Sequence, residues 1–484
     1  MFLGIDVGTS GVKAVLLDDD GRLADQATSP LGVSRPAPLL SEQDPADWWE
    51  ATQQAVLSLP SERRRQVRGI GIAGQMHGAT LLDEADRVLR PAILWNDGRA
   101  GEECAELERL EPRSRRITAN AAMAGFTAPK LLWVRRHEPD VFGAVRTVLL
   151  PKDHVRLLMT GDKATDMADA SGTLWLDVAE RKWSAEMLAA CGLGESEMPR
   201  LYEGSEVTGV LRREVAEAWG MDPVPVAAGG GDNAAAAVGL GVVHDGDAFL
   251  SLGTSGVSFV ATDTLRANPD RGLHAFCHAL PGRWHQMSVM LSAASCLDWA
   301  AALMGLGDVP ALLAAAEQAE GSTAPIFLPY LTGERTPHAN PHAMGVLFGL
   351  TASTDARETA RGVLDGVAMG LRDGVDAMTA AGSKVDSFTV AGGGSRSSYW
   401  GRLIASALEV PLVYREGGDV GPAFGAARLA RIAVDGASVE EVCVPPPITA
   451  AIEPEPDLVA YFMERQSRFR ALYSALLPSF GGSA

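Results

Sequence analysis

Two identical segments, GTSGV, occupy residues 8–12 and 253–257, about half a chain length apart. Each places glycines beside a threonine and a serine, directly after a short apolar segment. Glycine lets the backbone approach a ligand closely, and oriented N–H and O–H groups favour anions such as phosphate oxygens. One such turn is ordinary hairpin sequence, but two predict opposed turns around one polyphosphate. The candidate phosphate contacts are Gly8, Thr9, Ser10, Gly253, Thr254 and Ser255.

The residue two places before each turn differs between the copies, being Asp6 in the first and Ser251 in the second. A carboxylate beside phosphate is repelled unless a cation lies between them, and Mg²⁺ binds carboxylates together with substrate phosphates. We therefore expect Asp6 to hold Mg²⁺ and the second copy only to contact phosphate. Lys13 either adds a cationic contact to the phosphates or is a solvated strand residue.

Asp232 follows an apolar segment and three glycines in AAGGGDN, at the expected start of a helix. A helix N-terminus favours an ionised carboxylate. Phosphoryl transfer needs a group that orients the acceptor hydroxyl and accepts its proton. From the spacing alone, Asp232 is either that base or a helix cap. These glycines also fit a dinucleotide-binding turn, but an aspartate directly after them would oppose a pyrophosphate.

These candidate residues need strands that end close together. The segments 3–7 and 12–18, on either side of the first GTSG, are apolar and contain β-branched residues, which predicts a β-hairpin. Three later apolar segments, 68–78, 224–233 and 388–397, end in glycine-rich turns, and helix-compatible sequence follows the last two. Strands that alternate with helices predict an α/β architecture with ligands at the turns after strands.

Two further patterns define elements and domains. Asp44 and Pro45 suit the N-cap and the first position of a helix. Because a GTSGV hairpin opens each half of the chain, we expect a domain boundary near 240–248 and two domains, 1–244 and 245–484. No shorter repeat is evident, which excludes a solenoid.

The composition narrows the classes of partner. The chain has 484 residues, 46% of them hydrophobic, and a formal net charge of −19. Such a chain has material for packed cores and would be repelled by nucleic acid and anionic membranes. We expect no signal peptide, and the most apolar stretch, 287–307, is expected to be a buried helix because Asp298 interrupts it. The five scattered cysteines predict free thiols in a reducing cytoplasm.

Motifs along essentially the whole chain resemble those of the FGGY carbohydrate kinases. They include IDVGTSGVK, SEQDP, GIAGQMHGATLLD, RPAILWNDGR, FTAPKLLWV, LLPKDH, AGGGDNAA, LSLGTSGV, LPYLTGERTPH, AGGGSRS and GGDVGPAFGAARLA. The resemblance implies the α/β fold of the actin–hexokinase superfamily, with two actin-like (ribonuclease H-like) ATPase domains and a central cleft. The short turns recur across that superfamily, whereas GQMHG and LWNDGR are more discriminating.

The resemblance also implies roles for single residues. Asp232 would be the catalytic base, and Asp6 would hold Mg²⁺. The sugar would be bound by Met76, His77 and Asn233. ATP would be contacted by Gly8, Thr9, Ser10, Lys13, Gly253, Thr254, Ser255, Gly393, Gly394 and Ser397, the last three on the adenosine side, with the 417–425 loop nearby. Asp97 and Arg99 would either contact the sugar or form a structural ion pair.

The implied activity is ATP-dependent phosphorylation of a sugar. GQMHG favours a ketopentose, D-xylulose, over glycerol as the acceptor. Two alternatives remain at this point: the same reaction on D-ribulose, L-xylulose or arabitol, or an ATP-switched binding protein of the same fold that has no catalytic base. The expected partners are the sugar and ATP, without nucleic acid or membrane, and the resemblance implies a homodimer.

Overall fold

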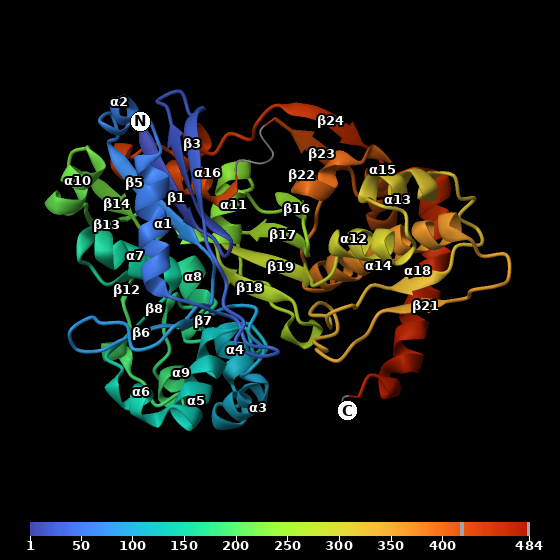
Figure 1. Ribbon diagram of the computed structural model, residues 1–484, viewed down its shortest axis with the longest axis horizontal. Coiled ribbons are helices and arrows are strands. Elements are labelled where there is room, and N and C mark those ends of the chain that lie inside the picture. The colour runs from blue at the N-terminus through green and yellow to red at the C-terminus, as the bar shows by residue number, and fades with distance from the viewer. Residues whose placement is uncertain (417–420, 482–484) are drawn as a thin grey trace.

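The computed structural model describes residues 1–416 and 421–481. Two lobes are evident, each built on a mixed sheet of seven strands (Figure 1). The first sheet contains, in spatial order, β13 (Val207–Val210), β14 (Pro225–Ala227), β5 (Gly69–Gly74), β1 (Phe2–Val7), β2 (Gly11–Leu17) and β3 (Leu23–Pro30), with β15 (Gly230–Gly231) also paired to β5. The expected hairpin is confirmed, because β1 and β2 are antiparallel neighbours.

Three parallel segments bring the first group of candidate residues to one edge of this sheet. β1 and β15 both pair in parallel with β5, and Val7 and Gly231 each pair with Gly74. The carboxyl ends of parallel strands meet at the same edge of a sheet. The first GTSG turn, the GQMHG turn and Asp232 therefore follow neighbouring strands at this edge.

Side chains alternate between the two faces of β1. Leu3, Ile5 and Val7 pack in the cluster that contains residues of α1 (Pro45–Leu57), whereas Phe2 packs with residues of α16 (Gly421–Asp435). As the sequence predicted, Asp44 is the N-cap of α1 and accepts a hydrogen bond from the Ala46 N–H. Asp6, which lies on the same face of β1 as Phe2, is thereby directed away from α1.

α16 comes from the second half of the sequence but packs against the first sheet (Figure 1). The approach requires glycine at Gly4, where a Cβ would lie 1.8 Å from the carbonyl oxygen of Ala423. α11 (Asp232–Leu240) packs against α16 in the same way, and a Cβ at Gly425 would lie 1.7 Å from the oxygen of Ala235. α16 belongs to the part of the chain after residue 244 but packs against the sheet of the first part. The domain boundary at 244/245 therefore remains a prediction.

The second sheet carries the other GTSGV copy. In spatial order its strands are β18 (His274–Cys277), β19 (Trp284–Met290), β17 (Gly256–Thr262), β16 (Ala248–Leu252), β22 (Phe388–Ala391), β23 (Leu412–Arg415) and β24 (Ile448–Ile452). The stretch 287–307 combines the end of β19 with α12 (Ser295–Leu303), so the expectation of a single buried helix was wrong. Across residues 1–416 and 421–481, no helix is long and apolar enough to cross a membrane.

Helices complete both lobes. Between β5 and β13 the chain forms α3 (Gly101–Leu110), α4 (Ser114–Thr118), α5 (Thr127–His137), α6 (Pro139–Ala144), α7 (Pro151–Thr160), α8 (Met167–Ser171) and α9 (Ala185–Ala190). The second lobe adds α12, α13 (Val309–Glu317), α14 (Ala356–Ala380), α15 (Ser398–Leu408) and α18 (Pro456–Leu476). One buried cluster joins Phe276 of β18 to Met76 and Phe126 of the first half, so the second sheet packs beside the GQMHG turn.

Candidate active site

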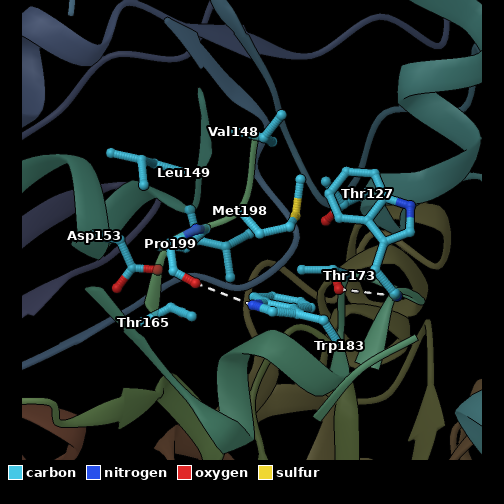
Figure 2. Close-up of a pocket in the computed structure, with 11 residues that line it drawn as sticks. Thr127, Val148, Leu149, Asp153, Thr165, Thr173, Trp183, Met198 and Pro199 are labelled. Carbon is cyan, nitrogen blue, oxygen red and sulfur yellow. Dashed lines mark hydrogen bonds between the residues drawn. The ribbon is translucent and has the colours of Figure 1, made fainter. Parts of the chain in front are cut away.

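One cavity of about 300 Å³ collects residues from both halves of the chain. It is lined by Asp232, Asn233, Ala236, Leu240, Phe249, Ser251, Ala391, Gly392, Gly421 and Pro422. Three motifs that are far apart in the sequence, AGGGDN, LSLGTSGV and AGGGSRS, therefore contribute to the same space. A second cavity lies inside the first lobe and is lined by residues that include Thr127, Asp153 and Trp183 (Figure 2). At about 10 Å³ it is too small for a sugar or a nucleotide.

Asp232 is the first residue of α11, directly after the N-cap Gly231. Its Oδ1 accepts hydrogen bonds from the neighbouring Asn233, from the backbone N at 2.7 Å and from Nδ2 at 2.9 Å. Burial raises the pKa of Asp232 to about 6, although the Asn233 hydrogen bonds lower it. Helix position alone had predicted a readily ionised group. The carboxylate is therefore ionised at neutral pH but close to its titration range.

Asp6 lies near Asp232 and is similarly perturbed. Burial and the charge of Asp232 raise the pKa of Asp6 to about 7, against the opposing effect of Lys13, its cross-strand neighbour. Asp6 Oδ1 is buried and has no hydrogen-bond partner among the described residues. A cation beside Asp6 would satisfy this oxygen and relieve its repulsion from Asp232. No cluster of three or more His, Cys, Asp or Glu side chains that could hold a metal by itself occurs in the described ranges. Asp6 therefore suits a metal ion that takes most of its ligands from substrate oxygens.

The GQMHG turn has a strained backbone at His77, where φ is 70°. Thr127 Oγ1 and Lys130 Nζ donate to the His77 carbonyl, at 3.2 and 2.9 Å, and hold this conformation. A non-glycine residue with positive φ is uncommon and persists where its surroundings enforce it.

The His77 ring is fixed as firmly as its backbone. Its Nδ1 is 2.8 Å from the Gly172 carbonyl oxygen, and Phe126 meets the ring edge-on with centroids 4.7 Å apart. Burial and the nearby Lys130 hold the pKa of His77 well below its usual value, so the ring is neutral. Because a carbonyl only accepts, Nδ1 carries the proton and Nε2 is left as an acceptor for a hydroxyl group.

Met76 connects this turn to the residues beside it. A Cβ at Gly231 would lie 2.8 Å from Met76 Cγ and 2.9 Å from its sulfur, which shows how closely the side chain covers the segment before Asp232. Met76 thus contacts the glycine that precedes Asp232 and Asn233. The structure therefore brings the sugar-side and catalytic candidates together, namely Met76, His77, Asp232 and Asn233. Of these four, Asp232 and Asn233 line the cavity.

The two GTSGV turns have the same sequence but different registers. Val7 pairs with Val12 around the first turn, whereas Leu252 pairs with Gly256 around the second, which is one residue tighter. Different neighbours account for this difference. In the second turn, the Ala294 and Ala293 N–H groups donate to the carbonyls of residues 253 and 254, at 3.0 and 2.9 Å.

In the first turn, the Thr9 hydroxyl is engaged within its own lobe. It donates to Gln75 Oε1 and accepts from Trp95 Nε1, both at 3.0 Å. Ser10 of this turn and Thr254 of the other are exposed. The two turns therefore differ at their threonines. The Thr9 hydroxyl of the first turn is already paired, whereas the equivalent Thr254 of the second turn is exposed.

The residues expected on the adenosine side follow β22. Gly393 and Gly394 begin a short 3₁₀ turn, and Ser397 Oγ accepts from the Trp400 N–H as the N-cap of α15. The cavity touches their neighbours Ala391 and Gly392 instead. Of the 417–425 loop, residues 417–420 lie outside the described ranges, whereas Gly421 and Pro422 line the cavity.

Of the two roles left open for Asp97 and Arg99, the structure shows the ion pair. Arg99 donates to both Asp97 oxygens, at 2.8 and 2.7 Å, and also pairs with Glu42 at 2.8 Å. Sequence reasoning assigned no role to Gln75, Trp95 or Lys130. Gln75 and Trp95 lie in motifs whose neighbouring residues had been assigned, whereas Lys130 lies in FTAPKLLWV, where no residue had been assigned.

Comparisons with known proteins place this geometry in context. Residues 1–239 match the N-terminal domain of the FGGY family of carbohydrate kinases, and residues 248–434 match its C-terminal domain. A xylulose kinase of Escherichia coli is 57% identical over 481 residues, which cover 99% of both chains. The crystal structure of a xyloylose kinase from Brucella ovis has a TM-score of 0.95 and 49% identity, with 99% of each chain covered. A Plasmodium falciparum glycerol kinase with ADP shares the fold, with a TM-score of 0.88, 18% identity and coverage of 100% and 98%.

Proposed function

Because the chain belongs to the FGGY family of carbohydrate kinases, we infer that it transfers the γ-phosphoryl group of ATP to D-xylulose, giving D-xylulose 5-phosphate and ADP. The full-length similarity to xylulose kinases supports the sugar. The observation that carries the chemistry is the shared cavity, in which Asp232 faces the same space as Ser251 of the second hairpin. A base and the strand that leads into a proposed phosphate-binding turn, on one cavity, suit transfer to a hydroxyl group.

Asp232 is proposed as the catalytic base. With a pKa of about 6, the carboxylate is ionised at neutral pH and basic enough to take the proton of the C5 hydroxyl as the bond to phosphorus forms. The ADP oxygen leaves from the opposite side of the phosphorus. Asn233, which donates to Asp232 Oδ1 from two nitrogens, holds the carboxylate in one orientation.

Met76 and His77 are proposed to orient the sugar. The neutral His77 ring presents Nε2 as an acceptor for a sugar hydroxyl, while Met76 covers the apolar side of the pocket beside Gly231. The backbone strain at His77 supports this role, because strained residues cluster at binding and catalytic sites.

The ATP phosphates are assigned to the two GTSG turns and the metal to Asp6. Magnesium bound with ATP supplies charge neutralisation on the β- and γ-phosphate oxygens. The orphaned Asp6 Oδ1 supports this assignment. Lys13, the cross-strand neighbour of Asp6, is proposed to add positive charge on the same side. Adenosine is assigned to the side of Gly393, Gly394 and Ser397, next to the cavity residue Gly392.

The remaining proposals concern partners and compartment. A net charge of −19 supports the absence of nucleic acid as a partner, and five free thiols support a reducing cytoplasm. We retain the homodimer as a proposal from the family resemblance, to be measured by light scattering after gel filtration.

The test is an ADP-release assay with product identification by mass and NMR. Wild type should form D-xylulose 5-phosphate, and Asp232→Ala should lose about 10²–10⁴-fold in kcat. Asp308→Ala is the matched control, because Asp308 is an exposed helix-capping aspartate of α13 in the other lobe. Equal sugar-dependent turnover by wild type and Asp232→Ala would disprove the assigned base. ADP release that does not respond to xylulose would disprove the assigned substrate.

A further inference from the structure

A chain of hydrogen bonds links the GQMHG turn to the first phosphate turn. Gln75 directly precedes Met76 and His77, and its Oε1 accepts from Thr9 Oγ1 at 3.0 Å. Its backbone N–H donates to the Val7 carbonyl at 2.9 Å. One residue therefore contacts the phosphate turn through its side chain and the strand before that turn through its backbone.

Gln43 and Trp48 extend this chain on the other side. Gln75 Nε2 donates to Gln43 Oε1 at 2.8 Å, and Gln43 Nε2 donates to the Thr9 carbonyl at 2.8 Å. Trp48 Nε1 donates to the same Gln43 Oε1 at 3.0 Å. With Trp95 on the Thr9 hydroxyl, two tryptophans, two glutamines and one threonine form a single network.

The direction of each bond in this network is determined by chemistry. An indole N–H only donates, so the Gln43 atom that meets Trp48 Nε1 is the acceptor Oε1. The Gln75 atom that bonds the same oxygen must therefore be Nε2, which leaves Gln75 Oε1 to accept the Thr9 hydroxyl hydrogen, while Trp95 donates to the Thr9 oxygen. Gln43, Trp48 and Gln75 are 3%, 0% and 2% exposed, so a lost bond leaves a buried polar group without water as a substitute.

We propose that Gln75, Gln43 and Trp95 are positioning residues, which act through Thr9 to fix the first phosphate turn relative to the sugar-side turn. In this role the Thr9 hydroxyl is a structural link and does not bind the phosphates itself. The proposal rests on the proposed function, because its purpose is to hold phosphate and acceptor hydroxyl in register. Phosphoryl transfer depends on such positioning, and misplacement by about 1 Å can lower the rate about 100-fold.

The first experiment replaces Trp95 by Phe, which removes the N–H donor and keeps an aromatic ring. We expect kcat to fall about tenfold and KM for ATP to rise, with KM for xylulose within about twofold. Trp49→Phe is the matched control, since the partly buried Trp49 of α1 packs beside Trp219. It should behave as wild type. A Trp95→Phe enzyme with wild-type kcat and KM for ATP would overturn the proposal.

A double-mutant cycle separates linkage from direct binding. Thr9→Val removes the hydroxyl at nearly constant volume, and Thr9→Ser restores it. We expect Thr9→Ser to keep activity within about threefold of wild type, and Trp95→Phe to add less than about twofold loss in the Thr9→Val background. Fully additive losses would show that Trp95 and Thr9 act independently and would overturn the proposal.

Amide hydrogen exchange tests the link without reference to the sugar. In the free protein, Trp95→Phe should speed exchange at least about tenfold in peptides that cover residues 8–12, with other peptides and Trp49→Phe unchanged. Unchanged exchange at 8–12 would overturn the proposal even in an inactive preparation. Failure of the wild type to phosphorylate xylulose would instead contradict only the proposed function.

Discussion

The carboxylates of Asp6 and Asp232 lie close enough that, together with burial, the charge of Asp232 raises the pKa of Asp6 to about 7. Asp6 lies near the end of β1 and Asp232 directly follows β15, two strands that each pair in parallel with β5, and the two residues come from opposite ends of the N-terminal half of the chain. Two carboxylates this close in a buried site favour either a proton or a cation between them. The proposed kinase uses the cation, which accompanies ATP.

The pH dependence of the free enzyme should report these two groups. As pH falls through about 7 and then about 6, Asp6 and Asp232 gain protons, so kcat/KM should decrease on the acid side. Bound metal favours ionised Asp6, so the acid limb of kcat should lie at lower pH than that of kcat/KM. The measurement is initial rate from about pH 5 to 9 at constant ionic strength. A flat profile between pH 5 and 8 would contradict both assignments.

Asp232→Asn should make the protein more stable while it removes activity. The folded-state pKa of Asp232 is raised, so its ionisation destabilises the fold above about pH 6, and this penalty disappears below the unfolded value. We expect the free energy of unfolding to rise by about 1–3 kcal/mol at pH 8 and by much less at pH 4.5. Urea denaturation at both pH values checks this. A loss of stability at pH 8 would mean that the carboxylate supports the fold.

Asp6→Asn should weaken the response to magnesium. A neutral amide is a poorer ligand than a carboxylate, so we expect the Mg²⁺ concentration at half-maximal rate to increase at least about tenfold and kcat to fall. Asp20→Asn, in the exposed turn between β2 and β3, is the control and should match wild type. Wild type treated with EDTA should lose its activity and regain it when Mg²⁺ is added. An unchanged magnesium response in Asp6→Asn would remove Asp6 from the metal site.

His77→Asn should affect the sugar and leave ATP binding intact. Asparagine tolerates the positive φ of this position, so the substitution removes the ring without adding backbone strain. We expect KM for xylulose to rise at least about tenfold and KM for ATP to change less than about threefold. The control is His137→Asn, at an exposed histidine that stacks on Trp133. Equal effects on both KM values would indicate a general disturbance of the first lobe.

Local patterns predicted the elements well. The β1–β2 hairpin follows from apolar β-branched segments around a glycine turn, and the start of α1 follows from Asp44 and Pro45. The strand-to-turn transitions at 68–78 and 388–397 were predicted from the same kind of signal. These features depend on residues adjacent in the chain, which is why a single sequence shows them.

Contacts between distant segments were not predictable in the same way. Thr9 was expected to face phosphate, but its hydroxyl pairs with Gln75 and Trp95, which lie 66 and 86 residues further along. Helix position suggested a readily ionised Asp232, but burial by surrounding segments raised its pKa. No local pattern specifies which far residue will supply a hydrogen bond or exclude water.

The two GTSGV segments show where this division falls. The sequence by itself determined that each would be a glycine turn in a β-hairpin, because backbone freedom and strand propensity are properties of the segment. Only the tertiary structure decided that the second turn closes one residue tighter, with Leu252 opposite Gly256. The physical reason is that hydrogen bonds from Ala293 and Ala294 hold that turn, whereas the network around Thr9 holds the first.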